Sequence, residues 1–135
     1  MSEANTKPAE AHFAVAGQLL DALAAHDFDA LASSFDDDAT LKALLPSRVL
    51  EKAGAPQIGG AFETWFGDVE EFELTDATVG AVGPLLQLRW LLRIRGGPRF
   101  GDTSHVVEQC AYAKTGPSGR IAQLSLLCSG FWPDE

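Results

Sequence analysis

The feature that most limits the possible folds lies in the second half of the chain, where four long segments rich in apolar residues follow one another. The segments are Glu71 to Val82, Leu85 to Arg95, Thr103 to Lys114 and Arg120 to Trp132. They are separated by Gly83-Pro84, Gly96-Gly97-Pro98 and Gly116-Pro117-Ser118-Gly119, which are typical of turns between consecutive antiparallel strands. This half is therefore predicted to form an antiparallel meander.

The first half has helical periodicity instead. The apolar positions Phe13, Ala16, Leu19, Leu20 and Leu23 recur at helical steps. They predict an amphipathic helix that Pro8 opens in its first turn and that ends at about His26. Asp27 is a suitable N-cap for a short second helix, which the acidic run 36–38 would stop. The apolar face of that second helix would contain Phe28, Leu31 and Phe35.

A mixed region connects the two halves. Here Ala39 to Leu45 is predicted as a strand and Gly54 to Gly60 as a loop, followed by a short helix with Phe62, Trp65 and Phe66. Helices first and strands afterwards predict an α+β fold with three N-terminal helices packed on a strongly curved antiparallel sheet. At 135 residues, the chain is expected to be a single domain over 1–135, with residues 1–7 as a flexible tail.

Composition argues against several classes of function. Nineteen acidic and ten basic residues give a net charge of −9, which disfavours binding to nucleic acid or to an anionic membrane. No apolar run reaches the ~18 to 20 residues of a membrane span, and no signal-peptide pattern is present, so a cytoplasmic location is expected. Cys110 and Cys128 lack metal-ligand spacing, and the sequence predicts neither a metal nor a cofactor.

Alternation along the strands predicts which side chains face the helices. In the segment 85–95 the inward set is Leu86, Leu88, Trp90, Leu92 and Ile94. For the last hairpin, a turn over 115–118 would pair Lys114 with Gly119. The inward set is then His105, Val107, Gln109, Ala111, Ala122, Leu124, Leu126 and Cys128. A slip of one residue would turn Glu108 and Tyr112 inward instead.

The same register separates the two cysteines. Cys110 would lie opposite Gln123, ~15 Å or more along the strand from Cys128 at ~3.3 Å per residue, and on the other face. Two reduced, unreactive thiols are therefore expected.

Charged residues are segregated along the meander. Four arginines between Asp76 and Asp102 have no acid among them, whereas the preceding segment 63–76 is acidic. Because these strands are neighbours, cross-strand ion pairs worth ~0.2 to 1 kcal/mol each are expected in preference to an anion site. Arg48, just after Pro46, is either a cation at the rim of a cavity or an exposed loop residue. A carboxylate–imidazole pair between Asp102 and His105 is not expected, because the spacing puts them on opposite faces.

One region resembles a known family. It reads Ala24-Ala25-His26-Asp27-Phe28-Asp29-Ala30-Leu31, followed by Phe35-Asp36-Asp37-Asp38-Ala39-Thr40-Leu41. This resembles the helix-turn-helix-strand opening of the nuclear transport factor 2-like superfamily, which includes SnoaL-like polyketide cyclases and ketosteroid isomerase. Gly59-Gly60-Ala61-Phe62 is similar to the glycine that precedes the family's third helix, and Gly119-Arg120-Ile121 resembles its last turn. The resemblance implies a cystatin-like, cone-shaped barrel with an internal pocket.

The catalytic positions of ketosteroid isomerase are mostly not filled. The resemblance places Ala43 where that enzyme has its general base and Leu19 where it has its oxyanion-binding tyrosine. Gln109 matches the position of its protonated aspartate. An amide donates a hydrogen bond but does not abstract a proton, so that proton-transfer route is not expected. The aspartate and arginine set of the epoxide hydrolases finds no convincing match, and whether the chain is an enzyme stays open.

Three functions remain as hypotheses. The leading one is a SnoaL-like protein that binds a hydrophobic or carbonyl-bearing small molecule, with His105 and Gln109 as orienting polar groups. The other predicted ligand-facing residues are Trp65, Trp90, Ala43, Leu45, Leu88 and Cys128. The two tryptophans are either core residues or walls for a flat ligand. The alternatives are an isomerase, cyclase or hydrolase that uses His105 as general acid or base, and a ligand-free interaction module. The resemblance also implies a homodimer through the outer sheet face.

Overall fold

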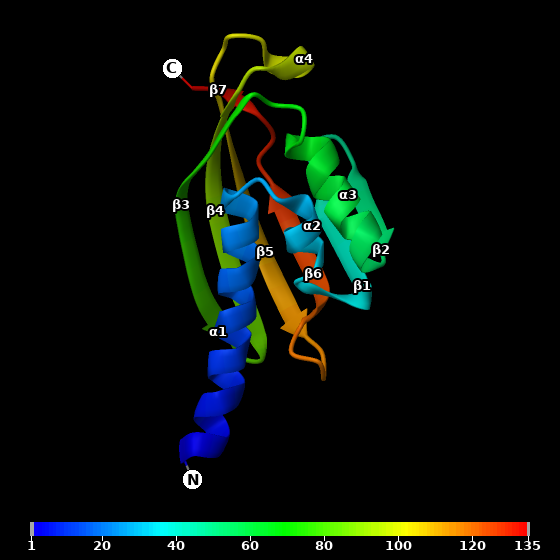
Figure 1. Cartoon of the computed structure of the whole chain (residues 1–135), viewed down its shortest axis with the longest axis vertical. Helices are drawn as coiled ribbons and strands as arrows, with labels where there is room; N and C mark the ends of the chain where they lie inside the picture. The colour runs from blue at the N-terminus through cyan, green and yellow to red at the C-terminus, as the bar shows by residue number, and fades with distance from the viewer. Residues whose placement is uncertain (1, 135) are drawn as a thin grey trace.

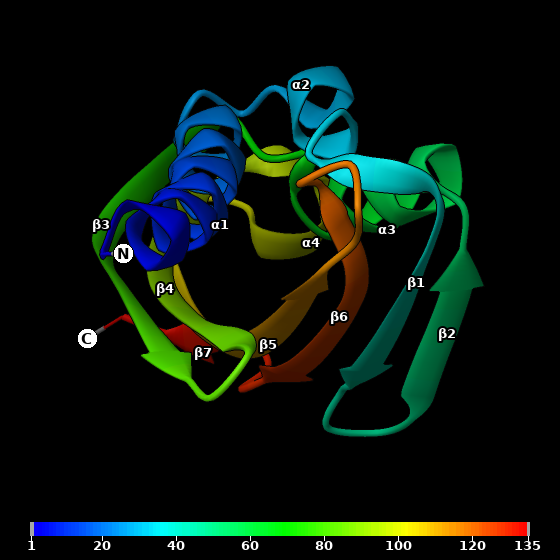
Figure 2. The ribbon, with the colours of Figure 1, turned by 90° about the horizontal axis from the view of Figure 1, so that it is seen from below.

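A strongly curved, open sheet wraps around one side of the molecule, and helices cover its concave face (Figures 1 and 2). The computed structural model describes the backbone of residues 2–134 and the side chains of residues 13–134. The helices in this part of the chain are α1 (Ser2–Ala24), α2 (Phe28–Ala32), α3 (Ala55–Phe66) and α4 (Gly97–Phe100). The strands are β1 (Phe35–Leu44), β2 (Val49–Ala53), β3 (Glu71–Val82), β4 (Leu85–Arg95), β5 (His105–Thr115), β6 (Ile121–Cys128) and β7 (Trp132–Pro133).

The sheet has seven strands in the order β2-β1-β6-β5-β4-β3, and β7 pairs with β5. β3 to β6 form the predicted antiparallel meander, and β1 pairs with β6 in parallel. The predicted α+β fold class is therefore confirmed. Among the described residues, no helix is both long and apolar enough to cross a membrane.

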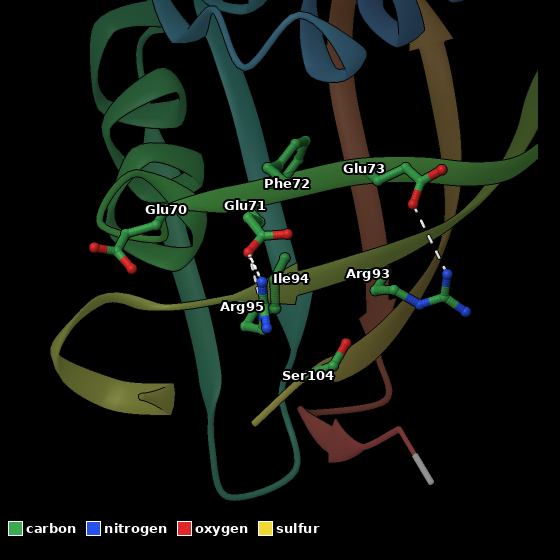
Figure 3. Close-up of a pocket in the computed structure, with 8 residues that line it drawn as sticks. All are labelled: Glu70, Glu71, Phe72, Glu73, Arg93, Ile94, Arg95 and Ser104. Atoms are coloured by element: carbon green, nitrogen blue, oxygen red, sulfur yellow. Dashed lines mark hydrogen bonds and ion pairs between the residues drawn. The ribbon is translucent and has the colours of Figure 1, made fainter. Parts of the chain in front are cut away.

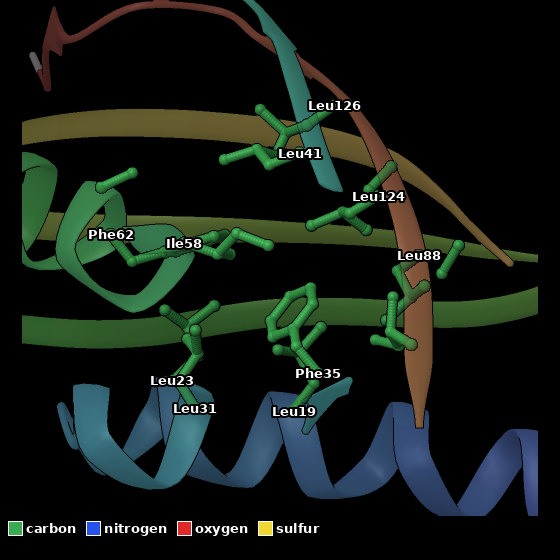
Figure 4. Close-up of a cluster of buried hydrophobic side chains, with 14 of the residues drawn as sticks. Leu19, Leu23, Leu31, Phe35, Leu41, Ile58, Phe62, Leu88, Leu124 and Leu126 are labelled. Atoms are coloured by element: carbon green, nitrogen blue, oxygen red, sulfur yellow. The ribbon is translucent and has the colours of Figure 1, made fainter. Parts of the chain in front are cut away.

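The core lies between the helices and the concave face of the sheet (Figure 4). The predicted inward set of β4 is confirmed, since every member is at most 2% exposed. Side chains of the first three helices meet this face, including Leu19, Leu23, Leu31, Ile58 and Phe62. Phe13 is an exception to the predicted helical stripe, since its ring is 45% exposed.

The ends of the first two helices differ in part from the prediction. α1 begins at Ser2 and not at Pro8, so Pro8 lies within the helix, where its missing N–H removes one backbone hydrogen bond. The flexible tail over residues 1–7 stays a prediction. At the other end His26 adopts a φ of 59°, and Asp27 N donates to Ala22 O at 3.0 Å, which terminates the helix. The Asp27 N-cap is confirmed, since its Oδ1 accepts from Ala30 N at 3.0 Å.

The region from Phe35 to Gly60 differs most from the prediction. Phe35 is the first residue of β1 and not part of α2, because it pairs with Ile121 of β6 and is fully buried. β2 was not predicted. The loop predicted over 54–60 is wrong, because Pro56 lies in the first turn of α3, where its missing N–H costs nothing. Gly59 thus lies inside α3, where a Cβ would come within 2.9 Å of Ala32 Cβ in α2.

The register of the last hairpin differs from the prediction by an even number of residues. Lys114 pairs with Gln123 and not with Gly119. An even shift keeps each side chain on its predicted face, so Gln109 and Cys128 do share the inner face. Ala122 is the exception, because the ladder is irregular there and Ile121 takes the buried position instead.

The corrected register also brings the cysteines closer than predicted. Cys110 lies opposite Leu127, next to Cys128 along the strand, and not opposite Gln123. The two residues nevertheless belong to opposite faces, and both are free thiols. Burial, together with the Glu108 carboxylate, raises the pKa of the Cys110 thiol.

The convex face shows the expected cross-strand ion pairs. Arg89 bridges Asp76, at 2.9 Å, and Glu108, and the two carboxylates raise the pKa of its guanidinium. The remaining pairs between β3 and β4 are Arg95 with Glu71 and Arg93 with Glu73. The arginines of β4 are therefore occupied by neighbouring carboxylates.

Candidate functional site

Three of the predicted ligand-facing residues, Leu45, Trp65 and Cys128, come together around an open pocket of about 470 Å³. The pocket lies where the loop after β1 meets the end of α3 and the segment between β6 and β7, and we call it the mouth pocket. Its other lining residues are Pro46, Ser47, Arg48, Ser129, Gly130, Phe131 and Trp132.

Two loops form the rim of the mouth pocket. In the first, Leu45 N donates to Arg48 O at 2.8 Å, which closes a tight turn. In the second, Trp132 Nε1 donates to Ser129 O at 2.9 Å. Gly130 has a φ of 83°, and a Cβ there would lie 2.9 Å from Pro46 Cγ. Glycine at this position therefore allows the two loops to touch.

Arg99 of α4 contacts both Trp65 and Phe131, which we call the aromatic wall of the pocket. Its guanidinium lies 5.3 Å from the centre of the Phe131 ring and donates to the backbone oxygen of Trp65. A second hydrogen bond, 2.9 Å long, goes to Asp68 Oδ1 and holds the pKa of that carboxyl below its usual value. One side chain of α4 thus connects Trp65 and Phe131.

Gln109 and Trp90 form a buried polar pair beneath the pocket. Trp90 Nε1 donates to Gln109 Oε1 at 2.8 Å, and both side chains are fully buried. The indole is only a donor, so the amide oxygen must face it and the amide nitrogen must point away. That nitrogen, Nε2, has no hydrogen-bond partner among the described residues. On the neighbouring strand, Gln109 pairs with Cys128 of the pocket lining.

His105 lies apart from the mouth pocket. Its half-buried ring packs 4.7 Å from the centre of the Phe100 ring. Its Nδ1 is 3.0 Å from the carbonyl oxygen of Thr103, so Nδ1–H donates there and not to Asp102. His105 is not among the lining residues of the mouth pocket.

The other predicted site residues are divided between core and rim. Ala43 and Leu88 are fully buried in the core. Arg48, which the sequence left open as a rim cation or a loop residue, is an exposed rim residue. Sequence reasoning missed Phe131 and Trp132, because it continued the last strand through them. The available signal was the Ser129-Gly130 pair, where β6 ends.

A second hollow, of about 590 Å³, lies over β3 and β4 (Figure 3). Its lining residues are Glu70, Glu71, Phe72, Glu73, Arg93, Ile94, Arg95 and Ser104. The arginines here already pair with carboxylates, as the dashed lines show. Within the described part of the chain, no three His, Cys, Asp or Glu side chains group as a metal site requires. The mouth pocket is therefore the stronger candidate.

Comparison with known proteins identifies the fold. Neither the family models nor the curated proteins gave a match to this sequence. Among solved structures, a candidate SnoaL-like polyketide cyclase from Shewanella denitrificans OS-217 superimposes with a TM-score of 0.66 at 18% identity, over 87% of this chain and 90% of that one. A candidate isomerase from Bacillus subtilis has a TM-score of 0.71 at 12% identity, over 90% and 88% of the two chains.

An epoxide hydrolase of the LEH-like kind from M. tuberculosis has the same architecture, with a TM-score of 0.62 at 18% identity over 89% of this chain and 84% of that one. The chain therefore has the fold of the SnoaL-like proteins, and the resemblance read from its sequence is confirmed at that level. At these identities the likeness shows the fold alone.

Proposed function

We propose that this protein binds a hydrophobic or carbonyl-bearing small molecule in the mouth pocket. The observation that supports this most directly is an open pocket of about 470 Å³ with Trp65, Phe131 and Trp132 in its lining. Ligand sites typically have this volume range and an apolar lining with few polar groups. The names of two structural neighbours, a polyketide cyclase and an epoxide hydrolase, refer to small-molecule substrates.

The structure favours the mouth over the deep interior as the place of binding. Ala43, Leu88 and Trp90 belong to a packed cluster of buried side chains. A ligand would therefore lie on the side of Cys128 and Trp65 that faces solvent. Gln109 pairs with Cys128 across the neighbouring strand, and its unpartnered amide nitrogen favours a ligand oxygen or a water there.

Binding is a better proposal than catalysis by His105. A general base must lie within hydrogen-bond reach of the substrate proton, and His105 packs on Phe100, outside the pocket lining. Its Nδ1–H is already engaged with Thr103. The His105 hypothesis thus needs a substrate that extends past Phe131 to reach the imidazole.

Tryptophan fluorescence gives a direct test, because Trp65 and Trp132 line the pocket. Titration with methyl 2-naphthyl ketone or coumarin is expected to change the emission saturably and to raise the melting temperature. Trp132→Ala should weaken binding about two- to tenfold, the usual value of one aromatic contact. Tyr112→Ala is the matched control, since this exposed ring belongs to the convex face. If no ketone, lactone or epoxide shifts either signal, the proposal fails.

We also propose that the convex face binds a second copy of this chain. Val49, Leu44 and Leu127 are direct cross-strand neighbours on β2, β1 and β6. They are 53%, 46% and 58% exposed and form a continuous apolar row. The next row contains Lys42 opposite Glu51. A two-fold axis through this surface would place Lys42 of one copy near Glu51 of the other, which is the self-complementarity that such an interface requires.

Leu127→Glu is expected to convert the dimer to a monomer, because it places a carboxylate at one end of the apolar row, where it would be buried in the interface. Sedimentation equilibrium at micromolar concentration should give twice 14.4 kDa for the wild type and 14.4 kDa for the variant. Val82→Glu, at a site 52% exposed at the end of β3, should remain dimeric. A wild type that sediments only at 14.4 kDa would rule out this interface.

A further inference from the structure

The mouth pocket contains a positive charge that has no counterion in the described part of the chain. The other arginines, Arg89, Arg93, Arg95, Arg99 and Arg120, each have a carboxylate oxygen within 4.0 Å. Arg48 has no such partner among residues 13–134. In a protein with a net charge of −9, an arginine without a carboxylate is the exception.

The lining of the mouth pocket also contains no acidic residue. Its ten residues include one charged side chain, Arg48, and the hydroxyls of Ser47 and Ser129. The carboxylates that dominate the surface elsewhere are therefore excluded from this rim. Glu108 and Asp68 lie next to lining residues, but their carboxylates are paired with Arg89 and Arg99. The unpaired charge at the pocket is therefore that of Arg48.

We propose that the ligand of this pocket is an aromatic or alicyclic carboxylate. This inference rests on the proposed function and specifies its ligand class. The flat apolar body packs against Trp65 and Phe131, and the carboxylate binds Arg48 at the rim. A guanidinium offers two parallel N–H donors that match the two carboxylate oxygens, which an ammonium does not.

A carboxylate fits this rim better than a phosphate. A phosphate group carries up to two charges and three acceptor oxygens, and such groups are usually held by several cations or by a row of backbone N–H groups. The mouth pocket supplies one guanidinium. Five of its lining residues, namely Leu45, Pro46, Trp65, Phe131 and Trp132, present apolar surface.

The experiment compares two ligands of nearly equal shape, 2-naphthoate and methyl 2-naphthyl ketone, by fluorescence titration of the wild type. The carboxylate is expected to bind about fivefold more tightly, the size expected for an exposed ion pair of good geometry. Arg48→Gln should abolish this preference, so that the variant binds the carboxylate and the ketone with similar affinity. Arg120→Gln is the control, because Arg120 pairs with Asp36 and lies outside the pocket lining.

The possible outcomes separate the two proposals. Equal binding of both ligands overturns the carboxylate inference and leaves the proposed function standing. A carboxylate preference that survives in Arg48→Gln also overturns it, since another group is then responsible. If neither ligand binds to the wild type, and circular dichroism shows that the wild type is folded, the proposed function fails and the inference fails with it. A preference that disappears in 0.5 M salt and in Arg48→Gln supports the ion pair.

Discussion

Trp90→Ala is expected to lower the free energy of unfolding by about 3–5 kcal/mol, the usual cost of removing a fully buried tryptophan. Trp90 lies in the middle of β4 and has no solvent exposure. Its ring centre is 6.3 Å from that of Phe62, so it joins the sheet to α3. The substitution also removes the hydrogen bond to Gln109 and leaves both polar atoms of that buried amide without a partner.

Urea unfolding followed by far-UV circular dichroism is the appropriate measurement, because tryptophan fluorescence changes with the substitution itself. Trp132→Ala is the matched control. Trp132 is 62% exposed, and its loss should change the free energy of unfolding by about 1 kcal/mol or less. Equal losses in the two variants would show that Trp90 is not part of the packed core.

Trp90→Phe and Gln109→Leu separate packing from hydrogen bonding. Each single substitution leaves one buried polar partner unpaired, which typically costs about 1–3 kcal/mol. The double variant removes both partners, so its loss of stability is expected to be smaller than the sum of the two. If the two losses add, the 2.8 Å hydrogen bond contributes little to stability.

The sequence was sufficient to predict β3 and β4, whose observed bounds are the predicted ones. In these strands the alternation of apolar and polar residues is long and regular, and flanking glycines mark the turns. The same alternation predicted correctly that Gln109 and Cys128 face inward. Alternation determines only the face of a side chain, however, and not the pairing partner. The pairing of Lys114 with Gln123 also depends on the irregular turn at residues 116–120, which no periodicity reveals.

Phe35 and β2 could not be predicted for a different reason. Phe35 continues the spacing of the second helix, and its place in β1 depends on pairing with Ile121, far along the chain. β2 is a short edge strand with one neighbour and little buried surface, so it has no inward-facing pattern. The conformations of Phe35 and of β2 both depend on pairing with other strands, and the local sequence does not encode that pairing.

The mouth pocket was predictable only in fragments. Leu45, Trp65 and Cys128 were identified individually, but they belong to three separate segments of the chain. Their proximity depends on the parallel pairing of β1 with β6 and on the contact of Gly130 with Pro46. The aromatic residues after β6 acquire their role only because the strand ends at Cys128.

Gly97→Ala is expected to be the most damaging glycine substitution near this pocket. Gly97 has a φ of 81°, which costs an alanine about 1–2 kcal/mol. Its Cβ would also lie 2.1 Å from the carbonyl oxygen of Asp68, so one backbone must move, at a further cost of about 1–3 kcal/mol. Arg99, two residues on, donates to Trp65 O and to Asp68 Oδ1. Displacement of α4 should therefore loosen the aromatic wall of the pocket as well.

Gly83→Ala separates backbone conformation from steric overlap. Gly83 has a φ of 57°, but its added Cβ would meet no atom within 4 Å. Urea unfolding should show a loss of about 1–2 kcal/mol for Gly83→Ala and about 2–5 kcal/mol for Gly97→Ala. Only Gly97→Ala should also weaken binding of methyl 2-naphthyl ketone. Equal effects of the two variants on stability and binding would mean that α4 moves at little cost, and that Arg99 does not hold Trp65 and Phe131 in place.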